Sequence, residues 1–121
     1  MRFVPYNPNP AGRNVGDCTV RAISKALNQE WNHTYWGLSI EGNLLKDMPS
    51  ANAVWGSYLQ HKGWRRALPV EDCTVCDFAE SHPVGTYILA LSGHVVCIQD
   101  GVLYDTWDSN NEIVIYYWQK G

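Results

Sequence analysis

The first two-thirds of the chain carries apolar residues at helical spacing. Val20, Ile23 and Leu27 fall at positions i, i+3 and i+7, which lie on one face of an α-helix. Asp17 precedes this pattern at the position of an N-cap, so Cys18 is expected in the first helical turn. The same reasoning predicts three further helices, at residues 32–45, 51–62 and 73–79.

The last third of the chain changes to runs of β-branched, apolar and aromatic residues, which are typical of strands. Four strands are predicted, at residues 86–91, 94–98, 102–104 and 113–118. Asp100-Gly101 is a strong two-residue hairpin signal between the second and third strands, and Ser92-Gly93 is expected to turn the first into the second. We therefore predict an α+β fold, in which a helical N-terminal half packs on a C-terminal antiparallel β-meander.

The opening of the chain reads differently from the rest. Residues 6–12 are rich in turn formers and contain two Asn-Pro pairs, which disfavour helix. We expect residues 1–12 to form a loop or an arm. The chain shows no internal repeat, low-complexity tract or linker, and 121 residues match the commonest size of one domain. A single domain over residues 1–121 is therefore predicted.

Charge and hydropathy exclude some classes of partner. A formal net charge of −3, from 9 basic and 12 acidic residues, supplies no electrostatic footprint for nucleic acid or for an anionic membrane. The N-terminus lacks an apolar signal core, and no stretch approaches the roughly 18 apolar residues of a membrane span. We expect a cytoplasmic protein with no nucleic-acid or membrane partner, whose four cysteines are mostly reduced thiols.

Cys18 is the first candidate for chemistry. A helix N-terminus favours a thiolate through its unpaired amide groups and the helix dipole, and the thiolate is the nucleophilic form of cysteine. A backbone amide and a nearby side-chain amide could together stabilise a tetrahedral oxyanion. Asn14 is the candidate for that side-chain donor. A lone cysteine at a helix start is more often a small packed residue, so the interpretation depends on its partners.

The predicted hairpin supplies those partners. A two-residue turn at 100–101 places Val96 opposite Asp105 and His94 opposite Trp107. His94 and Asp105 then share a face as diagonal neighbours, within reach of a hydrogen bond that fixes the imidazole tautomer. Asp108 is the alternative carboxylate, but in this register it points to the other face unless a bulge intervenes. Trp107 could shield the bond between His94 and Asp105 from water.

Three short motifs together resemble the papain-like cysteine peptidase superfamily. Residues 16–22, Gly-Asp-Cys-Thr-Val-Arg-Ala, resemble its nucleophile helix, and residues 93–96, Gly-His-Val-Val, resemble its histidine strand. Residues 105–107, Asp-Thr-Trp, are similar to its Asn-Ser-Trp tripeptide, with Asp in place of Asn. The resemblance covers about residues 12–108, and the small size is closer to compact bacterial and phage members, such as the bacteriocin-processing and cell-wall amidase types. The family's oxyanion glutamine would fall at Gly12, where this chain has no amide side chain, so only Asn14, Asn9 or Asn7 could substitute for it.

The resemblance implies a papain-like fold and a thiol peptidase or amidase with a catalytic triad of Cys18, His94 and Asp105. The substrate would be a peptide, a protein or peptidoglycan, and the reaction would be hydrolysis of an amide bond. The same triad also serves acyl transfer and deamidation, so it does not fix the substrate class. The alternative is a non-catalytic protein- or peptide-binding module on the same fold.

A metal site is not expected. Cys73 and Cys76 have the spacing of half a zinc site or of a redox pair, but no second pair of Cys or His residues stands at a matching distance. His61 and His82 do not complete such a set. We therefore predict no metal and no cofactor.

Overall fold

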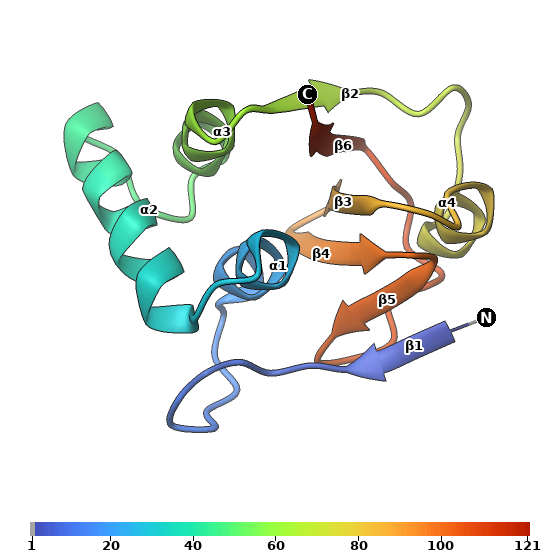
Figure 1. Ribbon diagram of the computed structural model, residues 1–121, viewed down its shortest axis with the longest axis horizontal. Helices are drawn as coiled ribbons and strands as arrows, with labels where there is room; N and C mark the ends of the chain where they lie inside the picture. Colours follow the sequence, from blue (N-terminus) through green and yellow to red (C-terminus); the bar gives the residue numbers. More distant parts are fainter. Residues whose placement is uncertain (1) are drawn as a thin grey trace.

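The computed structural model describes residues 2–121 and has an α+β fold with four helices and one six-stranded mixed sheet (Figure 1). The helices are α1 (Cys18–Leu27), α2 (Trp31–Leu45), α3 (Asn52–His61) and α4 (Val75–Ser81). The strands are β1 (Arg2–Pro5), β2 (Trp64–Ala67), β3 (Thr86–Leu91), β4 (His94–Gln99), β5 (Val102–Asp105) and β6 (Tyr116–Lys120). Within residues 2–121, none of the helices has the length and the apolar character that crossing a membrane requires.

The predicted hairpins are confirmed at the centre of the sheet. Leu91 pairs with His94 and Gln99 pairs with Val102, so each connection is a two-residue turn. Asp100 and Gly101 both have positive φ, 50° and 75°, which is the conformation that a twisted two-residue hairpin requires. Strands β3, β4 and β5 therefore form the expected antiparallel meander.

The sheet as a whole is not the predicted antiparallel meander. Its strand order is β1-β5-β4-β3-β6-β2, so β6 lies beside β3 and not beyond β5 (Figure 1). The last strand also begins at Tyr116, three residues after the predicted start. Residues 113 and 114 pair instead with the segment before α4, where Ile113 forms a bridge with Thr74 and Val114 donates a hydrogen bond to the Cys73 carbonyl.

The prediction that residues 1–12 are loop or arm is wrong for residues 2–5. These residues form β1, which pairs in parallel with β5 from Arg2 opposite Val102 to Pro5 opposite Asp105. The physical reason is that β5 would otherwise expose a row of unpaired backbone groups. Residues 6–12 contain no helix or strand, and Met1 lies outside the described residues.

The helices cover both faces of the sheet. Helices α1 and α3 pack on one face, with α2 packed against both of these helices, and α4 packs on the other face (Figure 1). A separate apolar core lies on each face of the sheet, and the side chains of β3 alternate between the two. Ile88 and Ala90 point into the core beneath α1 and α3, and Leu89 and Leu91 point into the core beneath α4. This alternation buries β3 from Ile88 onwards and holds α1 against β4, where the candidate site lies.

Candidate active site

The first residue of α1 is Cys18, as the apolar pattern predicts. Ala22 and Ile23 of the same helix are buried against the sheet, and this packing fixes the position of the helix start. Asp17 occupies the N-cap position, but its side chain makes no capping hydrogen bond to the helix. The first-turn amides of α1 therefore lie beside the thiol without a side-chain cap.

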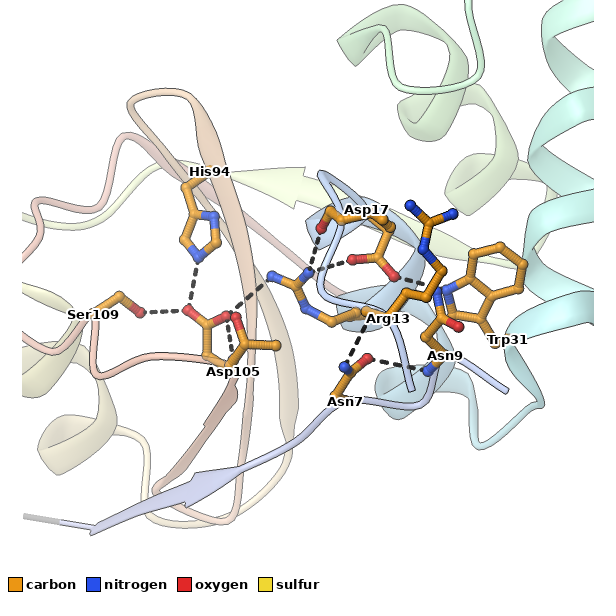
Figure 2. A network of polar contacts seen from close by, with 11 residues as sticks. Asn7, Asn9, Arg13, Asp17, Trp31, His94, Asp105 and Ser109 are labelled. Atoms are coloured by element: carbon orange, nitrogen blue, oxygen red, sulfur yellow. Dashed lines mark hydrogen bonds and ion pairs between the residues drawn. The ribbon is translucent and has the colours of Figure 1, made fainter. Parts of the chain in front are cut away.

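His94 joins the thiol to a carboxylate. Its Nε2 lies 2.7 Å from Oδ2 of Asp105 (Figure 2). Its ring also lies close enough to the Cys18 side chain to lower the pKa of the thiol. Because Asp105 engages Nε2, Nδ1 is the ring nitrogen left for the thiol. The three residues, far apart in sequence, thus lie next to one another in the order cysteine, imidazole, carboxylate.

The Asp105 carboxylate is buried and fixed by hydrogen bonds. It is 2% exposed and accepts hydrogen bonds from Ser109 Oγ at 2.9 Å and from the Thr106 backbone N–H at 2.7 Å. Its competitor Asp108 is exposed and accepts hydrogen bonds from the backbone and side chain of Asn110. The structure therefore brings Asp105, and not Asp108, to His94.

Arg21 is a site residue that the sequence analysis missed. Its guanidinium is buried, forms an ion pair with Asp17, and reaches Oδ1 of Asp105 from Nη2 at 3.3 Å. Asp17 in turn accepts a hydrogen bond from Trp31 Nε1 at 2.8 Å (Figure 2). The sequence did contain a signal for this ion pair, because Asp17 and Arg21 stand at positions i and i+4 of a predicted helix start. These contacts tie the nucleophile helix to the strand that carries the carboxylate.

The electrostatics of the three residues favour a charged pair. Burial opposes ionisation of Cys18, but the hydrogen bond with His94, a backbone hydrogen bond from Val95 and the charges of His94 and Arg21 outweigh it and lower the thiol pKa. Burial disfavours the cationic form of His94, but the hydrogen bonds with Asp105 and Cys18 raise its pKa to about 9. The thiolate of Cys18 and the imidazolium of His94 therefore stabilise each other.

The pKa of the Asp105 carboxyl group is also set by burial and by its hydrogen-bond partners. Burial raises the pKa of Asp105, but the hydrogen bond and charge of His94, with the hydrogen bonds from Ser109 and Thr106, lower it overall. Asp105 is therefore ionised at neutral pH, as required of a group that accepts the Nε2–H of His94 and stabilises the imidazolium.

The other three cysteines behave oppositely, although all four are free thiols. Burial raises the pKa of Cys97 to about 12 and, with nearby carboxylates, raises the pKa of Cys73. A hydrogen bond to Glu80 raises the pKa of Cys76. Cys18 is thus the one cysteine of the four whose surroundings lower its pKa, which is the property expected of a reactive thiol.

A cleft of about 400 Å³ opens over Cys18 and His94. Asn14, the candidate oxyanion donor, does not line this cleft, because it is exposed in the loop before α1. The amide side chain in the cleft is that of Asn52, at the start of α3. Its Oδ1 accepts a hydrogen bond from Trp55 Nε1 at 3.0 Å, which orients the amide and leaves its Nδ2 available as a donor. No sequence pattern marks Asn52, since its position depends on how α3 packs.

Trp107 lies against the imidazole, with its ring centroid 5.0 Å from that of His94 and a tilt of 31° between the rings. The indole is 47% exposed, so it covers the imidazole from the solvent side. It is placed where it can limit the access of water to the hydrogen bond between His94 and Asp105.

No family model, curated protein or solved structure matches this chain. The geometry of the site therefore carries the functional argument.

Proposed function

We propose that this protein is a papain-like cysteine hydrolase that cleaves an amide bond, with Cys18 as nucleophile, His94 as general base and acid, and Asp105 as the group that orients His94. The observation that carries this proposal is that the Cys18 thiol and the His94 imidazole line one cleft, with Nε2 of His94 held 2.7 Å from Oδ2 of Asp105. A nucleophile, a base and an orienting group in this order define nucleophilic catalysis by a triad.

The proposed reaction has two halves. The Cys18 thiolate attacks the substrate carbonyl carbon, and the resulting tetrahedral intermediate collapses as Nδ1 of the His94 imidazolium donates its proton to the departing amine. This leaves a thioester on Cys18 and a neutral imidazole. His94 then takes a proton from water, the hydroxide attacks the thioester, and the carboxylic acid leaves while the thiolate and imidazolium are restored.

The oxyanion of each tetrahedral intermediate needs donors. The backbone N–H of Cys18 at the start of α1 is one, and Nδ2 of Asn52 across the cleft is the proposed second. Asn52 takes the place that the sequence analysis gave to Asn14. Peptides, proteins and peptidoglycan all contain the amide bond that this machinery would cleave.

A small activated ester tests the proposal without knowledge of the natural substrate. With p-nitrophenyl acetate we expect a burst of p-nitrophenol, one equivalent per chain, and an acetyl adduct on Cys18 that disappears as the thioester hydrolyses. Cys18→Ser should abolish the burst and His94→Ala should slow it by at least tenfold. Cys76→Ser, which removes a partly exposed thiol outside the cleft, is the matched control and should leave the burst unchanged.

A non-catalytic binding module on the same arrangement predicts a different result. Acetylation of Cys18 would then be no faster than that of Cys73 or Cys76, and it would not depend on His94. That outcome would exclude the hydrolase.

A further inference from the structure

A second cavity, of about 420 Å³, lies between α1, α2 and the loop at residues 48–50. Its walls are mainly apolar side chains, among them Val20, Trp31, Tyr35, Leu38, Met48 and Pro49. Leu38 is 1% exposed and forms part of the core, whereas Tyr35 and Met48 are 43% and 68% exposed and stand at the mouth. The cavity is therefore open to solvent and closed at its base by the core.

This apolar pocket adjoins the cleft over Cys18. Gly16, Thr19 and Ser50 line both cavities. Gly16 and Thr19 stand two residues before and one residue after Cys18, and Asp17, its neighbour, also lines the apolar pocket. A group bound in the pocket would thus lie beside the turn of chain that carries the thiol, within the reach of one or two residues of an extended peptide.

The chemistry of the walls limits what the pocket can hold. Trp31 and Tyr35 stack on each other, with ring centroids 5.0 Å apart and 11° between their planes, so each ring holds the other in place and the pair forms a rigid aromatic wall. The one charged residue in the lining is Asp17, and its carboxylate is already engaged by Arg21 and by Trp31 Nε1. The lining therefore offers a ligand no free charge, and a charged group placed there would lose its hydration without compensation.

We propose that this pocket binds a bulky apolar side chain of a peptide substrate and so selects which amide bond reaches Cys18. The inference rests on the proposed function, because it assigns the substrate of the same site. A volume of about 420 Å³ accommodates an aromatic or leucine side chain. A difference of one methylene in such a pocket discriminates by about 10- to 200-fold.

Peptidyl chloromethyl ketones provide the test, because they alkylate an active-site cysteine after binding as substrates do. The probes carry Leu, Phe, Gly or Asp at each of the two positions nearest the electrophile, and mass spectrometry reports the rate of Cys18 labelling. At one of the positions, Leu or Phe should label at least tenfold faster than Gly or Asp at subsaturating probe concentration. Iodoacetamide, which has no side chain to place, measures the intrinsic reactivity of the thiol in parallel.

Two substitutions on α2 separate the pocket from the rest of the helix. Tyr35→Ser removes part of the aromatic wall and should reduce the preference for Leu and Phe by at least fivefold, with iodoacetamide labelling unchanged. Trp36→Ser removes the next aromatic side chain, which is 64% exposed and does not line the pocket, and it should preserve the preference.

The outcomes distinguish the inference from the function on which it rests. Rapid iodoacetamide labelling of Cys18 without any side-chain preference would overturn the pocket and leave the hydrolase standing. A preference that survives in Tyr35→Ser would also overturn it. Slow labelling of Cys18 by every reagent, iodoacetamide included, would overturn both proposals.

Discussion

Replacing Arg21 with alanine is expected to destabilise the protein severely. The Arg21 side chain is 6% exposed and stands between the carboxylates of Asp17 and Asp105, whose side chains are 6% and 1% exposed. Without the guanidinium, two buried negative charges lose their shared cation. Removing one partner of a buried ion pair costs about 3–5 kcal/mol.

The magnitude is large against the total stability of the fold. Globular proteins are stabilised by about 0.05–0.15 kcal/mol per residue, which gives roughly 6–18 kcal/mol for a chain of this length. Urea unfolding followed by tryptophan fluorescence measures the change. At an m-value of about 1.5 kcal/mol/M, the midpoint of Arg21→Ala should fall by about 2–3 M.

An exposed arginine supplies the control. Arg65 lies on β2 with its side chain at the surface, so Arg65→Ala should change the unfolding free energy by no more than about 0.5 kcal/mol. Arg21→Lys keeps the charge but loses the planar fork that contacts both carboxylates, and it should lie between wild type and Arg21→Ala. A cost below about 1 kcal/mol for Arg21→Ala would refute the argument that this residue locks α1 to β5.

Two further substitutions probe the histidine and its surroundings. Asp105→Asn removes the carboxylate that helps to raise the pKa of His94 to about 9, so an NMR titration of the His94 ring should give a lower pKa. An unchanged pKa would show that Asp105 does not raise it. In Trp107→Ala the loss of a side chain that is 47% exposed should alter the unfolding free energy by less than about 1 kcal/mol. Water would then reach the bond between His94 and Asp105, and the rate of Cys18 alkylation at pH 7 should fall several-fold. A rate equal to that of the wild type would show that the indole does not protect the bond.

Local sequence signals were sufficient to predict the centre of the molecule. The two-residue turn at Asp100 and Gly101 sets the register, and the observed pairing of Cys97 with Tyr104 is the register from which His94 and Asp105 were expected to meet. The helix start at Cys18 follows from the apolar period alone. These features depend on residues close together in the chain, which is why a pattern could reveal them.

The features that the sequence did not reveal depend on distant partners. Strands β1 and β2 are four residues each, and each forms because another strand, far along the chain, offers an edge to pair with. Arg21 is an ordinary helix residue until Asp105, 84 positions away, is brought beside it. Asn52 likewise enters the cleft only through the packing of α3, so no pattern near Cys18 could have distinguished it from Asn14.

The central claim is that Cys18 and His94 form a reactive pair, and the pH dependence of iodoacetamide alkylation tests it most directly. Because the pKa of Cys18 is lowered, its alkylation should already be rapid at pH values below the free-thiol pKa of ~8.5. In His94→Ala the hydrogen bond and charge that lower this pKa are lost, so the profile should move to higher pH. Mass spectrometry separates Cys18 from the other three thiols, whose profiles should be the same in both proteins. Slow alkylation of Cys18 below pH ~8.5, with a profile that does not change in His94→Ala, would contradict the account.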